Sequence, residues 1–295
     1  SLIREFRSAA PPELTKHLDE TAASVRRIRS RNRTLWAVSL AVIGGLAVFL
    51  WFGTDILVEW AVDRIPPEWE QRLGQSVYQD FLLQQKVIKE GPAVAAVQEI
   101  SQRLIDRIPG NRYRFEISVV RNDVVNAFAL PGGYVVVFTG LLEKAQSGEE
   151  VAGVLSHEFN HVLQRHGLER VVKQLGIVAV LSILLGDQQG LAGVMQQISV
   201  ELLSLKFGRA QETEADVTGL QLLHRARIDP AGMIAFFQRL SDQEQVRVEW
   251  LSSHPMSASR VERLKKELES LDKTLPEPFT FQWETVQQSI ATVAR

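Results

Sequence analysis

The chain has 295 residues, of which 23% are charged and 45% are hydrophobic, and its formal net charge is −2. This length suits one sizeable domain with appendages or two small domains, and the composition excludes wholesale disorder and a collagen-like structure. The near-neutral charge gives no basic field of the kind that binds nucleic acid, so no nucleic-acid partner is expected. The absence of cysteine excludes disulfide scaffolds, thiol catalysis and cysteine-ligated zinc or iron–sulfur sites.

The N-terminal region, residues 1–33, is predicted to be a basic, helical arm. Pro12 followed by Glu13 is typical of the start of a helix. Five residues at a 4-3-4-3 spacing follow: Leu14, Leu18, Thr21, Val25 and Ile28. This short heptad-like pattern is compatible with a contact between two copies of the chain, and equally with a helix resting on protein or lipid. Homo-oligomer formation therefore stays open.

Residues 34–54 are 21 consecutive residues without a formal charge. A helix of this length covers roughly 31 Å, about the thickness of one hydrocarbon core, which predicts a transmembrane helix in a lipid bilayer rather than a buried core helix. Charged residues flank it asymmetrically, with Arg26, Arg27, Arg29, Arg31 and Arg33 before it and Asp55, Glu59 and Asp63 after it. The positive-inside rule then places the N-terminus in the cytoplasm and residues after 55 on the opposite side.

The remainder of the chain is predicted to be mainly α with a small β-sheet, an α+β fold. Helical patterns near 68–87 and 93–107 precede an alternating strand pattern over 113–119. A hairpin is expected from 126–130 and 134–138 with a Pro-Gly-Gly turn, and nearly everything after Thr139 reads as helix. The apolar run 175–186 is too short to span a bilayer, which leaves a core helix and a membrane-dipping segment as alternatives. We expect the main domain at 55–275 and a C-terminal tail at 276–295.

The sequence His157-Glu158-Phe159-Asn160-His161 carries the chemistry. Ser147 and Glu150 form a capping pattern that predicts a helix starting there, and Gly167 is expected to end it. His157 and His161 are then one turn apart on one face and can share a metal ion. Glu158 beside them has the reach to take a proton from a metal-bound water.

Zinc catalysis requires a third protein ligand and leaves a fourth position for water. His166 lies about 180° around the helix from His157, so it is expected to face away. Glu212 and Asp216 lie at i and i+4 of a later helical pattern, where one carboxylate can bind the metal and the other can orient a histidine. Glu214 is expected to make a surface or structural contact instead.

Four separated stretches together resemble the M-forty-eight peptidase family of membrane-associated zinc peptidases, which includes HtpX, the CAAX prenyl protease and Oma-type proteases. They are NAFALPGGYVVV (126–137), HEFNHVLQRHGLER (157–170), R-x-x-E-x-E-A-D (209–216) and HPMSASR (254–260). The N-terminal anchor and the pattern Trp-Glu-x-x-Leu-Gly at 69–74 are most similar to the Oma-type branch. Gly208 and Arg227 depart from the family pattern, which often has serine and glycine there, but neither belongs to the metal set.

The resemblance implies a gluzincin-type zinc metallopeptidase domain with one Zn²⁺ per chain. The family's zinc ligands match His157, His161 and Glu212, its general base matches Glu158, and its orienting acid matches Asp216. A loop near the active site is implied for His254, which either stabilises the oxyanion or occupies the open position of zinc as a plug.

Two further parts of the site leave alternatives open. Arg260 follows the His254 loop and has either a functional role or a structural ion pair. The candidate substrate strand comprises Asn126, Ala127, Phe128, Ala129 and Leu130, whose open edge would bind an extended polypeptide through backbone hydrogen bonds. An ordinary sheet strand is the alternative reading.

These features predict a membrane-anchored zinc endopeptidase that hydrolyses misfolded or membrane-proximal proteins. The alternative is a chaperone-like or binding module that keeps the peptidase fold with little cleavage. We expect a single-pass inner-membrane protein with a cytoplasmic N-terminus and a periplasmic catalytic domain, or a protein of the mitochondrial inner membrane.

Overall fold

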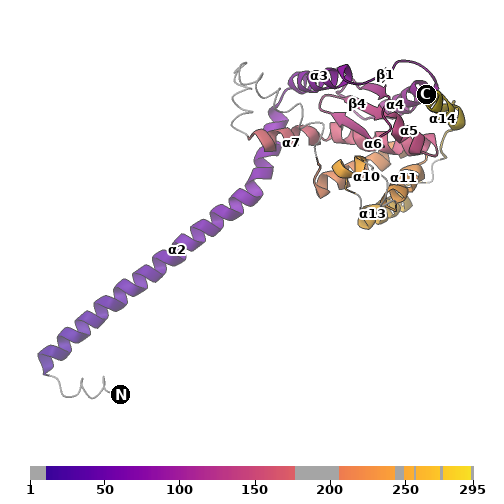
Figure 1. Cartoon of the computed structure of the whole chain (residues 1–295). Helices are drawn as coiled ribbons and strands as arrows, with labels where there is room; N and C mark the ends of the chain where they lie inside the picture. Colours follow the sequence, from indigo (N-terminus) through magenta and orange to yellow (C-terminus); the bar gives the residue numbers. More distant parts are fainter. Residues whose placement is uncertain (1–10, 177–205, 243–248, 256, 273–274, 294–295) are drawn as a thin grey trace. The chain divides into compact units, whose positions relative to one another are not determined.

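The computed structural model describes residues 11–176, 206–242, 249–255, 257–272 and 275–293. The chain divides into two compact units, residues 1–57 and 58–295. The apolar run at 175–186, for which two alternatives were considered, lies almost entirely outside the described residues. Figure 1 shows the elements of the chain.

Helix α2, Pro12–Arg64, begins at the proline that the sequence indicated. Val25 and Ile28 of the heptad-like pattern are exposed, as are Leu35 and Trp36 at the start of the uncharged stretch. Among the described residues, we find no helix with both the length and the apolar character needed to cross a membrane. The side chains of residues 46–55 lie outside the description. The transmembrane helix at 34–54 therefore stays a prediction.

A small sheet lies in the second unit, and its four strands are β1 (Val87–Ile88), β2 (Glu116–Val120), β3 (Ala127–Leu130) and β4 (Tyr134–Phe138). Their spatial order is β1-β2-β4-β3. The predicted hairpin of β3 and β4 is confirmed, with Ala129 opposite Val135. Strand β2 runs parallel to β4, and β1 antiparallel to β2. Strand β3 is consequently an edge of the sheet.

Helices make up most of the rest, which confirms the expected mainly helical class with a small sheet. They are α3 (Pro67–Leu83), α4 (Pro92–Ile105), α5 (Thr139–Lys144), α6 (Gly148–Leu163), α7 (His166–Leu175), α10 (Arg209–Arg225), α11 (Ala231–Ser241), α12 (Trp250–Ser253), α13 (Ala258–Ser270) and α14 (Trp283–Val293). The helix expected over 68–87 ends four residues earlier, at Leu83, and the last of the expected residues, Val87, belongs to β1 instead.

Helix α6 is the centre of this unit. It runs between the sheet and the layer formed by α10, α11 and α13 (Figure 1). Its residues Val151, Leu155 and Phe159 are fully buried, as expected for a helix covered on all sides. A Cβ built on Gly153 would lie 2.6 Å from the Met233 backbone, so only glycine lets α11 approach so closely.

Two local features bear on the earlier expectations. Arg227, where the family pattern often has glycine, adopts a left-handed conformation with φ of 56°, the backbone state that glycine would ease. The segment expected as a C-terminal tail contains α14, whose Val286 and Ile290 are buried in the main hydrophobic core.

Candidate metal centre

Local hydrogen bonds fix the start of α6. The backbone N–H of Glu150 donates to the Ser147 hydroxyl at 3.4 Å, and the N–H of Gln146 donates to the Glu150 carboxylate at 2.7 Å. Ser147 is thus the predicted N-cap, whereas Glu150 accepts from the residue before the cap instead of from Ser147 itself. His157 and His161 lie in the second half of the helix.

The prediction for the end of this helix was wrong. Helix α6 ends at Leu163 instead of continuing to Gly167, and Arg165 is left-handed with φ of 58°. This turn starts α7 at His166 and swings its ring back, so that its Nδ1 lies 3.0 Å from His161 Nδ1. His166 therefore does not face away, although its Nε2 contacts the half-exposed Glu214 at 3.4 Å.

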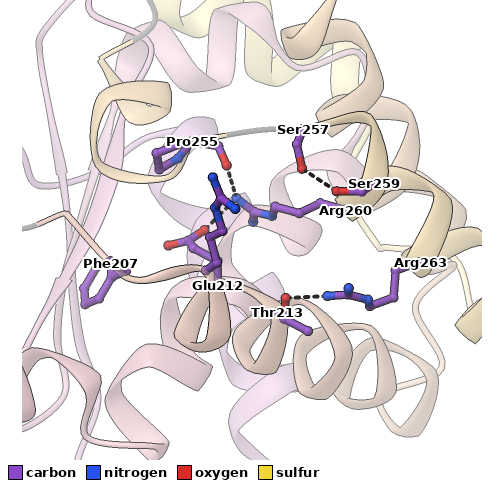
Figure 2. Close-up of a pocket in the computed structure, with 9 residues that line it drawn as sticks. Phe207, Glu212, Thr213, Pro255, Ser257, Ser259, Arg260 and Arg263 are labelled. Carbon is purple, nitrogen blue, oxygen red and sulfur yellow. Dashed lines mark hydrogen bonds and ion pairs between the residues drawn. The ribbon is translucent and has the colours of Figure 1, made fainter. Parts of the chain in front are cut away.

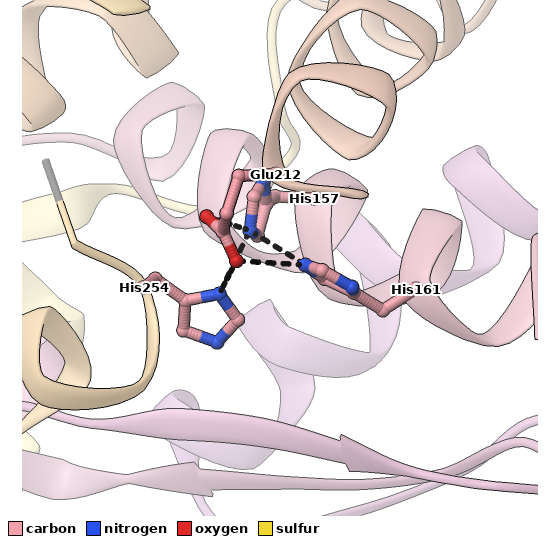
Figure 3. A group of neighbouring side chains, drawn as sticks. All are labelled: His157, His161, Glu212 and His254. Atoms are coloured by element: carbon pink, nitrogen blue, oxygen red, sulfur yellow. Dashed lines mark hydrogen bonds and ion pairs between the residues drawn. The ribbon is translucent and has the colours of Figure 1, made fainter. Parts of the chain in front are cut away.

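Four buried side chains converge behind this helix: His157, His161, Glu212 and His254. One nitrogen or oxygen of each lies within 4.8 Å of the others (Figure 3). The Nε2 atoms of the two helix histidines are 3.0 Å apart. Glu212 contacts them at 3.7 and 3.6 Å, and His254 Nδ1 lies 2.9 Å from Glu212 Oε1 and 3.1 Å from His157 Nε2.

This donor set fits a divalent metal ion. Zinc–nitrogen bonds of about 2.0–2.1 Å in a tetrahedral shell put two nitrogens about 3.3 Å apart, close to the observed separation. Burial lowers the pKa of His157, lowers that of His161 well below its usual value and lowers that of His254 to about 3. All three imidazoles are therefore neutral, which is the form that binds metals. Two or three imidazoles with one carboxylate are ligands typical of zinc.

A carboxylate and a guanidinium support the cluster from behind. Asp216 Oδ1 lies 3.0 Å from His157 Nδ1, the ring nitrogen opposite the cluster. Arg260 donates to both Asp216 oxygens at 2.7 Å and contacts Glu212 Oε2 at 2.6 Å. Burial alone would raise the pKa of Asp216, but its contacts with His157 and Arg260 lower it. Arg260 thus forms buried ion pairs with two carboxylates of the site.

Glu158 lies beside the cluster and is held by two donors. Its Oε2 accepts the backbone N–H of Ala129 at 3.1 Å, and its Oε1 accepts the indole N–H of Trp250 at 2.9 Å. His254 Nε2 is 3.4 Å from the same Oε1 atom. Burial raises the pKa of Glu158 to about 8, so the group has a high proton affinity.

The candidate substrate strand lies against this carboxylate. Residues Ala127–Leu130 form β3, whereas Asn126 precedes the strand and its carbonyl accepts the Phe138 N–H at 3.1 Å. Phe128 and Ala129 are partly exposed. The structure thus brings the predicted strand and Glu158 together.

Two aromatic residues of the site were not found by sequence reasoning. Trp250 is fully buried and stacks on the His254 ring at 4.8 Å between centroids. Phe207 stacks on His161 at 3.9 Å and on His254 at 5.3 Å. Trp250 lies four residues before His254, a spacing that signals one helical face, whereas Phe207 carries no comparable signal.

Buried imidazoles and a carboxylate beside a second, held glutamate are the side-chain set typical of the zinc metallopeptidase class. The comparison of sequences agrees with this class. The chain belongs to Peptidase family M48, whose model matches residues 93–268. This confirms the family resemblance that the four sequence stretches indicated.

Named relatives fall into two groups. The chain is 28% identical to mitochondrial metalloendopeptidase OMA1 of Schizosaccharomyces pombe over 206 residues, 68% of this chain and 61% of that protein. For the Bos taurus metalloendopeptidase OMA1 the identity is 29% over 292 residues, 90% of this chain and 54% of that protein. The beta-barrel assembly-enhancing protease of Yersinia pestis is 32% identical over 178 residues, 56% of this chain and 37% of that protein. The chain thus spans less than two thirds of each of these relatives.

Proposed function

We propose that this chain is a membrane-anchored, zinc-dependent endopeptidase that hydrolyses misfolded or membrane-proximal proteins. The observation that carries the proposal is the buried cluster of His157, His161 and Glu212 with Glu158 beside it, next to a sheet edge. A binding module that does not cleave has no need of a buried, two-donor glutamate beside a metal site, which argues against the chaperone-like alternative.

His157, His161 and Glu212 would hold one zinc ion per chain through two Nε2 atoms and a carboxylate oxygen. Bound zinc supplies an activated water and polarises the carbonyl of the scissile bond. Asp216 fixes the orientation of the His157 ring through Nδ1, and Arg260 holds Asp216 and Glu212 in register. These contacts pre-organise the ligand set before any substrate binds.

Glu158 is proposed as the general base. The donors from Trp250 and Ala129 hold its carboxylate toward the cluster, so it can accept the proton of the attacking water and later deliver that proton to the leaving amine. Its raised proton affinity suits a group that must take a proton and keep it through one step.

The open edge of β3 is proposed to bind the substrate polypeptide in an extended conformation. Phe138 donates to Asn126 within the hairpin, while the Ala129 N–H points to Glu158, away from β4. By the alternation of an antiparallel ladder, the main-chain groups of Ala127 and the Ala129 carbonyl point outward, where a peptide can add as a further strand. This mode tolerates many side chains.

Membrane anchoring through residues 34–54 is part of the proposal. It is supported by the uncharged stretch and the five preceding arginines. The two relatives named OMA1 are described as mitochondrial, which supports the mitochondrial inner membrane as an alternative to a bacterial inner membrane with a periplasmic domain.

The test compares wild type with Glu158→Gln for zinc content and for cleavage of unfolded casein. We expect about one zinc per chain in both proteins, and cleavage at least about 10²–10⁴-fold slower in the variant, because glutamine keeps the shape but cannot accept a proton. Chelation followed by zinc addition should abolish and restore wild-type cleavage. Zinc-loaded wild type without cleavage would favour the binding module, and retained cleavage by the variant would remove Glu158 from the mechanism.

A further inference from the structure

A cavity of about 470 Å³ opens beside the metal cluster. Nine residues from the segment before α10, from α10 itself, from the His254 loop and from α13 line it (Figure 2): Phe207, Arg209, Glu212, Thr213, Pro255, Ser257, Ser259, Arg260 and Arg263. Glu212 belongs to both the cavity and the cluster, so anything bound here lies next to the proposed metal. No residue of β3 lines it, so the cavity is separate from the proposed strand-addition edge.

The wall of the cavity carries more positive than negative side chains. Every nitrogen of the Arg260 guanidinium already bonds to Asp216, Glu212 or the Pro255 carbonyl, so Arg260 has few donors left for a ligand in the cavity. Arg263 makes one side-chain hydrogen bond, from Nη1 to the Thr213 hydroxyl. Within the described part of the chain, Arg209 has no hydrogen-bond or ion-pair partner, and no carboxylate pairs with Arg263.

Two guanidinium groups therefore face this space with donors to spare, and Glu212 is its only carboxylate among the lining residues. Both arginines are exposed at the rim, where an incoming anion can reach them. The hydroxyls of Ser257 and Ser259 add polar lining, and Phe207 and Pro255 offer apolar surface for an aliphatic stem. A guanidinium binds a carboxylate through two parallel N–H···O bonds, the geometry in which it discriminates best.

We propose that this cavity is a substrate subsite that binds a carboxylate of the polypeptide through Arg209 and Arg263. This carboxylate is either an aspartate or glutamate side chain of the substrate near the scissile bond, or the C-terminal carboxylate of the substrate. The inference rests on the proposed peptidase function and adds a specificity that the backbone-directed β3 edge does not provide. Since both arginines are solvent-accessible, the preference should weaken with salt.

The first experiment measures binding without hydrolysis. Fluorescence anisotropy with full-length Glu158→Gln protein compares four otherwise identical labelled peptides: internal glutamate or glutamine, each with a free or an amidated C-terminus. We expect about tenfold tighter binding of one carboxylate-bearing peptide over its neutral partner at low salt. Preference for internal glutamate identifies the side chain, and preference for the free terminus identifies the C-terminus.

The same measurement on Arg209→Gln/Arg263→Gln protein should reduce the preference to within about twofold. Arg107→Gln is the matched control, since Arg107 is an exposed arginine that does not line the cavity and should leave the preference unchanged. Equal or undetectable binding of all four peptides overturns the proposal, as does a preference that survives the double substitution or is lost equally in the control.

Cleavage of the four peptides by proteins that retain Glu158, with and without the two arginine substitutions, separates the subsite from the proposed peptidase function. Cleavage of neutral and acidic peptides at equal rates by both the wild type and the double variant would leave the peptidase intact and remove the subsite. A carboxylate preference in binding, with no cleavage of any peptide, would keep the subsite and remove the peptidase. We expect wild type to cleave the preferred acidic peptide faster than its neutral partner. In Arg209→Glu/Arg263→Glu, where the charge of both side chains is reversed, this difference in rate should disappear.

Discussion

The His254 ring lies among all the groups proposed to do chemistry. Its Nδ1 is 2.9 Å from Glu212 and 3.1 Å from His157 Nε2, and its Nε2 is 3.4 Å from Glu158. Stacking on Trp250 and Phe207 holds it there, buried and neutral. With a zinc ion held by His157, His161 and Glu212, a neutral imidazole at this place would compete with water for the fourth position.

His254→Ala should therefore raise the basal cleavage of an unfolded substrate, because the variant frees that position. Initial rates at matched zinc content provide the measurement, with His224→Ala as control, a histidine whose Nε2 contacts the Asp272 carbonyl outside the cluster. A fall of about 10²–10³-fold would instead assign oxyanion stabilisation to His254. No change would exclude both roles.

The relative positions of site residues could be predicted from the sequence where a single helix carries them. His157, Glu158 and His161 share one capped helix, so their relative placement follows from the helical repeat. The placement of His166 was wrong because arginine rarely adopts a left-handed backbone, and nothing local indicated that Arg165 does so. Phe207 was missed because its stacking joins segments far apart in the chain.

A buried ion pair between elements explains the left-handed turn at Arg165, where α6 gives way to α7. Arg165 donates to Glu70 at 2.9 Å and to the Val62 and Ile65 carbonyls at the end of α2. Glu70 on α3 also accepts from the Tyr113 hydroxyl, and the Gly132 N–H of the β3–β4 turn lies 3.4 Å from it. One pair thus links the junction of α6 and α7 to α3 and to the turn of the substrate strand.

Arg165→Ala should lower the free energy of unfolding by about 3–5 kcal/mol, because it leaves the buried Glu70 carboxylate without its cationic partner. Denaturant unfolding of the full chain measures the effect. In Arg165→Ala/Glu70→Gln, the cost should be smaller than the sum of the two single substitutions, since the residues are coupled. The exposed Arg107→Ala should stay within about 0.5 kcal/mol of wild type. Additive losses would contradict the coupling.

In the sheet, the sequence pattern predicts the hairpin but not the order of the strands. The hairpin of β3 and β4 was predictable from its turn residues and alternation, because its contacts are local. The parallel pairing of β2 with β4 was not, because β3 lies between them in the sequence but not in the sheet. This order makes β3 the edge beside Glu158, and it depends on packing against α6.

For the whole molecule, the proposed topology has a direct test. A reporter fused after residue 60 should be active only on the non-cytoplasmic side of the membrane, because the arginines before residue 34 favour a cytoplasmic N-terminus. Two reporters serve as controls for each other, one active only in the cytoplasm and one active only on the opposite side of the membrane. Activity on the cytoplasmic side, or protection of the domain from external protease in spheroplasts, would contradict the predicted orientation.

The buried cluster on α6 and α10 is the proposed zinc site of this member of Peptidase family M48. The most direct measurement is the zinc content of purified, folded His157→Ala, His161→Ala and Glu212→Ala proteins beside wild type. His166→Ala is the control, since this ring contacts His161 but does not belong to the converging group. We predict about one zinc per chain in wild type and in the control, and a clear loss in each ligand variant. Full zinc in Glu212→Ala, together with its loss in His166→Ala, would exclude Glu212 as the third ligand and assign that place to His166.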